Sequence, residues 1–219
     1  MSNQDYLHFH GIQKAFPGVL ALDGIDFGLR EGSINALVGE NGAGKSTLLR
    51  ILAGLLRPSL GKVIMFGDYE PHDVRERIGF MSHAPMLYDE LTGKENLEYF
   101  AKLYPGCKCL SPAEVLRQVG LDPDLPRTLS QYSQGMRQRT SLARVLLPIP
   151  ELLLLDEPFS NMDVESVQQM VALLAGFRHS SRTIVLTTHQ RELAAPIADW
   201  VLTLKAGRVA SFTPGRPTL

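Results

Sequence analysis

The stretch Gly39-Glu40-Asn41-Gly42-Ala43-Gly44-Lys45-Ser46 decides the fold of this chain, because it satisfies the pattern G-x-x-x-x-G-K-[ST] in full. Backbone N–H groups can converge on a chain of phosphates only where glycine leaves room or accepts a positive φ. The apolar run 34–38 before it predicts a buried strand, and the helical spacing of apolar residues from Lys45 to Leu56 predicts a helix that stops at Arg57-Pro58. We therefore predict a strand, a phosphate-binding turn and a helix in succession.

The residues of this turn have predicted tasks in binding a nucleotide. The helix that begins at Gly44 directs the positive end of its dipole at the phosphates. Lys45 is expected to reach the β- and γ-phosphates of ATP, and Ser46 to offer its hydroxyl to Mg²⁺. ATP and Mg²⁺ are therefore the expected ligands. The residues predicted to bind the nucleotide here are Gly39, Asn41, Gly42, Ala43, Gly44, Lys45, Ser46 and Thr47.

A second apolar run, Leu152–Leu155, predicts a buried strand that ends in two carboxylates, Asp156 and Glu157. Because side chains alternate along a strand, the two carboxylates can point in different directions. Asp156 is expected to hold Mg²⁺, directly or through water, and Glu157 to orient and deprotonate the water that attacks the γ-phosphorus. Taken alone, the pair fits a solvated acidic turn as well; behind the phosphate-binding turn, a metal and water site is favoured.

Strands and helices alternate along the rest of the chain. Two capping boxes, Thr92 with Glu95 and Ser111 with Glu114, predict two helices in its middle. The other predicted elements are strands over 6–13, 22–29 and 183–187 and helices over 134–147 and 164–177. This alternation predicts an α/β protein with a parallel sheet that is covered by helices on both faces.

The composition bounds the class of protein. The 219 residues carry a formal net charge of −1, with 44% hydrophobic and 21% charged residues, so a packed core is expected. No broad basic field is present, and nucleic acid is not expected as the main partner. The sequence shows no secretory signal after Met1, and no apolar run approaches the roughly 20 residues that cross a bilayer. Any work at a membrane is expected to be done from outside the lipid.

Three further motifs resemble those of the ATP-binding-cassette (ABC) family. Residues 129–139, Leu-Ser-Gln-Tyr-Ser-Gln-Gly-Met-Arg-Gln-Arg, look like the family signature ahead of its helix, with Ser-Gln-Gly in place of the usual Ser-Gly-Gly. Residues 160–163, Ser-Asn-Met-Asp, resemble the dimer-contact loop, and His189 resembles the switch histidine that hydrogen-bonds the γ-phosphate. The resemblance runs from about Leu7 to Val209, with the motifs in family order.

This resemblance implies a fold and a location. The fold would be a P-loop NTPase (RecA-like) parallel-sheet core with an N-terminal antiparallel β subdomain and an inserted α-helical signature subdomain at about 84–147. These parts would form a single ABC ATPase domain over 1–219. The chain would be cytoplasmic and peripheral, held on the inner face of the cell membrane by transmembrane permease subunits.

The resemblance also implies a dimer with a second ATP-binding subunit, most simply a homodimer. Ser133, Gln134 and Gly135 would close on the ATP of the other subunit, with the N-terminus of the following helix as a second anion site. Asp163 would lie in the dimer-contact loop. The residues to which the resemblance assigns catalysis are Glu157, His189 and Lys45.

Two more positions are assigned in the same way. Phe16 lies where the family places an aromatic ring that stacks on adenine; the alternative is a core phenylalanine beside Pro17 and Val19. His83 occupies the position of a glutamine that touches Mg²⁺ and the attacking water. A neutral imidazole can also bind metal-bound water, so His83 is a further candidate ligand in the metal site.

The type of transporter is left open by the sequence. Residues 83–92, followed by Glu95-Asn96-Leu97, are similar to the ATP-binding subunit of cytochrome c maturation, often called the haem exporter ATPase. That similarity implies ATP-driven haem export across the cytoplasmic membrane. The alternative is the ATPase of a drug, antibiotic or polysaccharide exporter, because residues 132–136 fit that group equally well.

Other classes of ATPase fit the sequence less well. A soluble ABC protein of the ribosome would carry two cassettes, and a chromosome or DNA-repair ATPase would split its cassette with a long coiled coil. A regulatory P-loop protein that does not hydrolyse nucleotide would lack Glu157 or the signature. The predicted activity is therefore hydrolysis of ATP to ADP and phosphate, coupled to transport.

Overall fold

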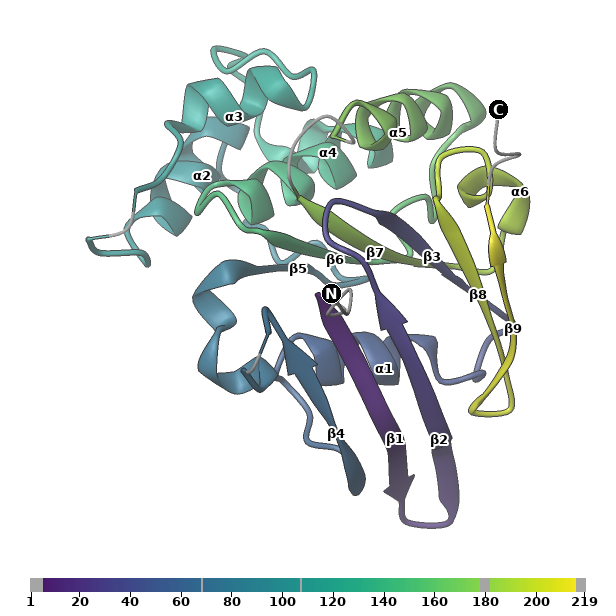
Figure 1. Cartoon of the computed structure of the whole chain (residues 1–219). Helices are drawn as coiled ribbons and strands as arrows, with labels where there is room; N and C mark the ends of the chain where they lie inside the picture. The colour runs from purple at the N-terminus through teal and green to yellow at the C-terminus, as the bar shows by residue number, and fades with distance from the viewer. Residues whose placement is uncertain (1–5, 68, 107, 178–181, 216–219) are drawn as a thin grey trace.

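The computed structural model describes residues 6–67, 69–106, 108–177 and 182–215 of the chain. The N-terminal residues 1–5, in which the sequence shows no signal, lie outside this range. Two β-sheets face each other with one helix between them, and further helices cover the outer face of the larger sheet (Figure 1).

The smaller sheet is antiparallel, with the strand order β2-β1-β4. The larger sheet has the order β5-β6-β7-β3-β8-β9 and is parallel except for the pairing of β8 with β9. The strands of the smaller sheet are β1 (Leu7–Phe16), β2 (Val19–Leu29) and β4 (Leu60–Met65). Those of the larger sheet are β3 (Ile34–Val38), β5 (Ile78–Met81), β6 (Leu152–Asp156), β7 (Thr183–Thr188), β8 (Trp200–Lys205) and β9 (Arg208–Pro214).

Apart from the short helix α6, the helices fall into three groups. Helix α1 lies between the two sheets, α4 and α5 lie on the other face of the larger sheet, and α2 and α3 join α4 in a helical lobe to one side (Figure 1). The helices are α1 (Lys45–Leu52), α2 (Gly93–Ala101), α3 (Pro112–Gln118), α4 (Gln134–Leu146), α5 (Val164–Gly176) and α6 (Arg191–Ala194). The helical lobe thus lies between β5 and β6 in the chain, where an inserted helical segment is expected.

The core is divided by the larger sheet into two clusters, and β6 shows how. Leu152 and Leu154 pack on the side of α1 and the smaller sheet, whereas Leu153 and Leu155 pack on the side of α4 and α5. This alternation follows from the two-residue period of a strand. Because Asp156 continues the series of Leu152 and Leu154, its side chain points toward α1.

Both predicted capping boxes are present. The Thr92 hydroxyl accepts from the Glu95 N–H while the Glu95 carboxylate accepts from the Thr92 N–H, and Ser111 and Glu114 repeat the arrangement at α3. The two helices begin where the sequence predicts, because a capping box depends only on two residues three positions apart.

The expected first helix is too long. It was expected to run to Leu56, but α1 ends at Leu52. Gly54 takes a φ of 66°, and the Leu55 N–H turns back to donate to the Arg50 carbonyl at 3.0 Å. A glycine in the left-handed conformation just beyond the last turn stops a helix in this way, although the apolar spacing continues.

The predicted strands 6–13 and 22–29 are too short. They extend into a two-residue hairpin in which Phe16 pairs with Val19 around Pro17 and Gly18. Strands β4, β5, β8 and β9 were not predicted from the sequence. In β5 buried residues alternate with partly exposed ones, and every residue of β9 is at least partly exposed, so neither strand presents a long apolar run.

Candidate functional site

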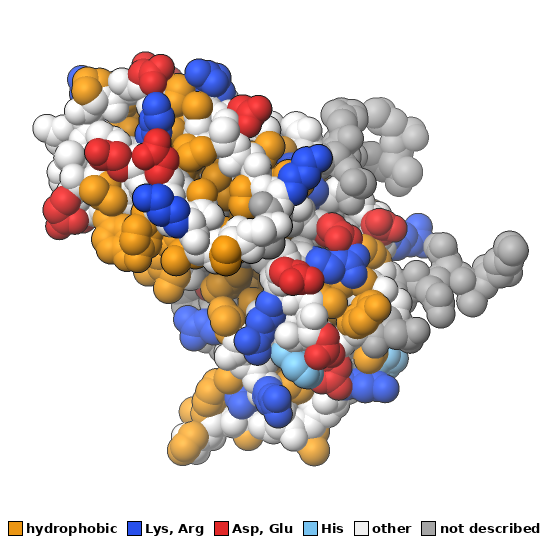
Figure 2. Space-filling view, turned by 90° about the vertical axis from the view of Figure 1, so that its left-hand side faces the viewer, with side chains coloured by type: hydrophobic (Ala, Val, Ile, Leu, Met, Phe, Trp, Pro, Cys, Tyr) orange, Lys and Arg blue, Asp and Glu red, His pale blue; other side chains and the backbone are white. Residues whose placement is uncertain are grey.

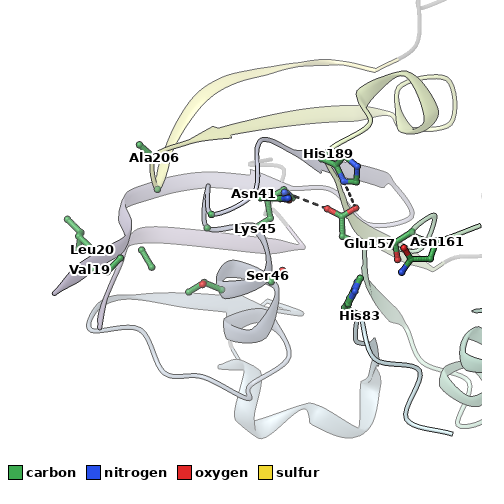
Figure 3. Close-up of a pocket in the computed structure, with 16 residues that line it drawn as sticks. Val19, Leu20, Asn41, Lys45, Ser46, His83, Glu157, Asn161, His189 and Ala206 are labelled. Atoms are coloured by element: carbon green, nitrogen blue, oxygen red, sulfur yellow. Dashed lines mark hydrogen bonds and ion pairs between the residues drawn. The ribbon is translucent and has the colours of Figure 1, made fainter. Parts of the chain in front are cut away.

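A cavity of about 630 Å³ opens where the carboxyl ends of β3, β6 and β7 meet the N-terminus of α1 (Figure 3). Ligands of open α/β sheets bind in the crevice outside the carboxyl ends of the strands. The residues that line the cavity are Val19, Leu20, Ala21, Asn41, Gly42, Gly44, Lys45, Ser46, Thr47, His83, Glu157, Ser160, Asn161, His189, Ala206 and Gly207.

The glycine-rich turn forms the middle of the cavity wall, and two of its glycines are needed for different reasons. Gly42 has a φ of 81° with open space around it, so only its backbone conformation requires glycine. Gly44, at the N-cap of α1, has a φ of 104°, and a Cβ there would lie 2.6 Å from the Ala21 carbonyl oxygen. The turn is therefore held both by conformation and by close packing on β2.

Lys45 is buried, with 6% of its surface exposed, yet its amine faces the cavity. The amine donates to the carbonyls of Gly39 at 2.8 Å and Glu40 at 3.1 Å and lies 3.6 Å from the Glu157 carboxylate. A buried ammonium is costly unless it is paired and hydrogen-bonded. Its partners come from the turn itself and from the end of β6, so the ammonium is fixed at the centre of the site.

Asp156 lies beneath the cavity and joins three elements. Its Oδ1 accepts from the Ser46 hydroxyl at 2.9 Å and from the Thr187 hydroxyl at 2.7 Å. Ser46 stands in the first turn of α1 and Thr187 on β7, next to β6 in the sheet. The Ser46–Asp156 contact brings two hard oxygen donors together at the base of the turn.

Glu157 projects directly into the cavity from the end of β6. Its φ is 53°, a conformation that costs a residue other than glycine about 1 to 3 kcal/mol and that tends to occur at functional sites. The strained backbone is held by a hydrogen bond from the Glu157 N–H to the Thr187 hydroxyl at 2.9 Å. Its carboxylate lies between the Lys45 amine and His189 Nδ1, the latter at 3.1 Å (Figure 3).

The two ends of the cavity differ in chemistry. Val19, Leu20 and Ala206 lie at one end, and Glu157 and the two histidines lie at the other, with the turn between them (Figure 3). Val19 and Leu20 are 61% and 51% exposed, which is unusual for large apolar side chains beside a pocket of glycines and charges. An elongated ligand with a flat apolar head and an anionic tail fits this polarity.

The predicted signature turn lies outside the residues that line this cavity. Ser133 is the N-cap of α4, and its hydroxyl accepts from the Met136 N–H at 3.2 Å. Gln134 is exposed and Gly135 is buried against α5. Asp163 is the N-cap of α5 and accepts from the Ser166 N–H at 2.8 Å. Among the described residues, these four therefore lie apart from the lining of the main cavity.

Comparison with known proteins agrees with this geometry. The sequence profile described as "ABC transporter" matches residues 22–160, which include the glycine-rich turn, the signature turn and the two carboxylates. The chain belongs to the ABC transporter family. The ABC cassette thus identified contains the expected α/β core with its parallel sheet, antiparallel β-sheet and helical lobe.

Relatives and solved structures extend the comparison. The cassette is 39% identical over 196 residues to the fluoroquinolones export ATP-binding protein MT2762 of Mycobacterium tuberculosis, covering 88% of this chain and 64% of that protein. It is 36% identical over 229 residues to the nickel import ATP-binding protein NikO of Rhodobacter capsulatus, covering 95% and 89%. A dimeric post-hydrolysis structure of the ATP-binding cassette MJ0796, bound to ADP and Pi, is similar with a TM-score of 0.83 and 25% identity, covering 97% and 100%.

Most residues predicted to bind the nucleotide line the cavity of the cassette. Those that do are Asn41, Gly42, Gly44, Lys45, Ser46 and Thr47, together with Glu157, His189 and His83. Gly39 and Ala43 line a neighbouring cavity of about 450 Å³ on the other side of the same turn, next to Thr203–Ala206. His83 follows β5, and Figure 3 places it near Glu157, so the structure brings it to the charged end.

Phe16 does not line the main cavity. It is 43% exposed at the end of the hairpin, and the Lys14 amine lies 5.2 Å from the centre of its ring. It is therefore not a core phenylalanine either. The hairpin places Val19 and Leu20 at the cavity instead, because the strands turn back directly after Phe16.

Sequence reasoning missed the apolar end of the site and the residue that holds Glu157. Val19, Leu20, Ala206 and Gly207 come from the β1–β2 hairpin and the β8–β9 turn, which carry no motif. Thr187 was taken only as a strand residue, although its hydroxyl contacts both Asp156 and the Glu157 backbone. The one available signal was the pair of polar residues, Thr187 and Thr188, that ends a fully buried strand.

Two findings concern metals and membranes. Within the described ranges, no group of three or more His, Cys, Asp or Glu side chains is arranged to hold a metal ion. None of the helices that the structure describes has the length and apolar character needed to cross a membrane.

Proposed function

We propose that this chain is the ATP-hydrolysing subunit of an ABC exporter for a drug- or antibiotic-like compound, working as a pair with a second copy. It would act on the cytoplasmic face of the membrane, docked on transmembrane permease subunits. The observation that carries the ATPase part is the position of Glu157, whose carboxylate stands between Lys45 and His189 at the mouth of the phosphate-binding turn.

The cavity offers a complementary place to each part of ATP. The backbone N–H groups at the start of α1 are free of a side-chain cap and would donate to the phosphates, and Lys45 would add a positive charge beside the β- and γ-phosphates. The apolar end at Val19 and Leu20 would receive the adenine. Phe16, exposed on the same hairpin, would complete the adenine contact only from outside the cavity.

Hydrolysis would be promoted by Glu157 as general base. The carboxylate accepts a proton from water as the water oxygen bonds to the γ-phosphorus and the bond to the β–γ bridging oxygen breaks, leaving ADP and phosphate. Lys45 offsets the negative charge of the phosphates, and His189 orients the carboxylate through its 3.1 Å contact and is available to the γ-phosphate. The strained φ of Glu157 keeps this side chain in the cavity.

The residues of the site also suit the magnesium ion that accompanies ATP. Ser46 and Asp156 supply a hydroxyl and a carboxylate 2.9 Å apart at the base of the turn, which are donors that Mg²⁺ prefers. Bound there, Mg²⁺ would neutralise charge on the phosphates. His83 at the same end could contact water near this position.

The dimer is supported by the position of the signature turn. None of Ser133, Gln134 and Gly135 lines the main cavity of its own chain, and the similar cassette MJ0796 has been solved as a dimer. In a pair of cassettes, this turn would cap the γ-phosphate held by the other copy, and Asp163 would lie in the contact. ATP would then join the two copies, and its hydrolysis would let them separate.

The class of cargo rests on relatives alone. The fluoroquinolones export protein favours export of drug-like compounds, while NikO is named for import, so direction remains part of the proposal. Haem export is the second reading, and it depends on the similarity of residues 83–92 to the cytochrome c maturation subunit. No finding from the comparisons supports it over the first reading.

The glutamate variant tests the proposed motor. Glu157→Gln should retain Mg-ATP binding, lose about 100- to 10,000-fold in hydrolysis rate because the base is absent, and elute as a long-lived dimer in size-exclusion chromatography with Mg-ATP. Hydrolysis at the wild-type rate would show that Glu157 is not the base. A variant that binds ATP but stays monomeric would contradict the nucleotide-bridged pair.

The cargo is tested with the native membrane complex, purified through a tag on this chain. Its ATPase rate should rise with a fluoroquinolone and stay unchanged with haem. A rate that rises with haem and not with a fluoroquinolone would favour the haem-export hypothesis over the drug-export hypothesis.

A further inference from the structure

The loop that follows Glu157 ends at Asp163, which forms two hydrogen bonds with Ser166 in the first turn of α5. Asp163 caps α5, and both of its carboxylate oxygens accept from Ser166: Oδ1 from the N–H at 2.8 Å and Oδ2 from the hydroxyl at 2.9 Å. These two bonds lower the pKa of Asp163, so the carboxylate stays ionised and keeps both acceptors. Ser166 is buried, with 9% of its surface exposed. The position of its side chain is therefore fixed relative to Asp163.

The signature turn packs directly on this serine. A Cβ built on Gly135 would collide with the Ser166 hydroxyl oxygen and would lie 2.6 Å from the Ser166 Cβ. Gly135 is in the first turn of α4, and its φ is outside the positive region. The need for glycine at this position is therefore spatial: it lets α4 approach Ser166.

The same loop reaches the nucleotide cavity at its other end. Ser160 and Asn161 line the cavity beside Glu157, and the Ser160 N–H donates to the Glu157 carbonyl at 3.1 Å. Asn161 takes a φ of 58°, so the loop is tightly turned at this point. A short, hydrogen-bonded segment thus leads from the cavity to Asp163 and Ser166.

We infer that Ser166 is a positioning residue that couples the signature turn of one chain to the nucleotide cavity of the same chain. It holds the signature turn, which acts on the partner's nucleotide, at a set distance from the loop that contacts the chain's own nucleotide. This inference rests on the proposed function. Binding of ATP in the cavity, which touches Ser160 and Asn161, would then set the position of Gly135 before the partner arrives.

A double-mutant cycle of Gly135→Ala, Ser166→Gly and the two together tests whether the close packing of Gly135 on Ser166 positions the signature turn. Gly135→Ala should lower kcat at least about tenfold, because the new methyl pushes α4 away from Ser166. Ser166→Gly in the same chain vacates that space, so the double variant should regain at least about threefold over Gly135→Ala; contacting residues are expected to be non-additive. If the losses of the single variants simply multiply, the contact does not position the turn.

The role of the hydrogen bond from the Ser166 hydroxyl to Asp163 is tested in the Glu157→Gln variant, which should form a long-lived dimer with ATP. Ser166→Ala keeps the Cβ against Gly135 and the N–H bond to Asp163 Oδ1, but it removes the hydroxyl bond to Asp163 Oδ2. The ATP-bound dimer should dissociate at least about fivefold faster, while the ATP affinity of the monomer, measured by fluorescence titration, stays within about twofold, since coupled groups show their interaction only when both are engaged.

Ser111→Ala is the control, because it also removes a serine hydroxyl that donates to a carboxylate in the first turn of a helix, here Glu114 of α3 at 2.6 Å, away from Gly135. It should leave the dimer lifetime unchanged. An equal effect of the two alanine variants, or no effect of Ser166→Ala, would leave Ser166 with no role beyond supporting the Asp163 cap of α5. A Glu157→Gln protein with Ser166 intact that forms no dimer would instead count against the proposed function.

Discussion

The phosphate-binding turn and the signature turn both begin a helix with small residues, yet they are built in opposite ways. Gly44, the N-cap of α1, makes no side-chain capping bond, whereas the N-cap of α4, Ser133, already accepts from the Met136 N–H. The first turn lines the 630 Å³ cavity with Lys45 buried at its centre. The second contributes no lining residue to that cavity.

This difference shows which donors are reserved for a ligand. A helix N-terminus leaves several N–H groups without partners, and a cap satisfies one of them locally. At α1 these N–H groups border the cavity, so we expect one chain to bind a nucleotide by itself. At α4 the Ser133 hydroxyl accepts from one N–H and the turn lies outside the cavity, so we expect a ligand of this turn to come from a second copy. Variants of the two turns should therefore differ in what they do to a single chain and to a pair of chains.

The largest effect is expected for Lys45→Ala. Removing the buried ammonium should cost about 2 to 5 kcal/mol of ATP binding, a loss of affinity of roughly 30- to 4,000-fold. Isothermal titration of the monomer with Mg-ATP measures it. Lys205→Ala, an exposed lysine beyond the same turn, is the matched control and should bind as the wild type does. Unchanged affinity in Lys45→Ala would show that the turn does not hold the phosphates.

Ser133→Ala should have an intermediate effect that is confined to the pair. The monomer should keep its ATP affinity, while steady-state ATPase falls about 10- to 150-fold because one hydrogen bond to a charged phosphate, worth about 1.5 to 3 kcal/mol, is lost. The lost cap should also lower the free energy of unfolding by about 1 kcal/mol. Ser111→Ala should show the same change in stability by thermal unfolding without the loss of ATPase. Weaker ATP binding by the monomer would place Ser133 at the chain's own nucleotide.

The smallest effect is expected for His83→Gln at the charged end of the cavity. An amide can donate and accept as an imidazole does, so ATPase should stay the same or rise. A change of no more than about threefold, less than 1 kcal/mol of activation free energy, is expected in the steady-state rate. Complete loss of activity would show that the imidazole itself is required.

The sequence predicts those parts of the site whose residues are close together along the chain. The turn 39–46, the capping boxes and the opposite directions of Asp156 and Glu157 are consequences of short-range spacing, and they stand in the structure as expected. The end of α1 was misplaced because one glycine overrides a continuing apolar pattern. The assignment of Phe16 to the adenine by resemblance stays a prediction, and the structure adds Val19 and Leu20 as residues of the cavity wall.

By itself, the sequence determined the class of fold, the phosphate-binding turn and the identity of the two carboxylates, since periodicity and motif spacing act over a few residues. Only the tertiary structure decided how Val19 and Ala206 form one wall, how Thr187 holds Glu157, and how Gly135 rests on Ser166. Those contacts join segments far apart in the chain. Their geometry is set by the packing of sheets and helices against one another, which leaves no periodic trace in the sequence.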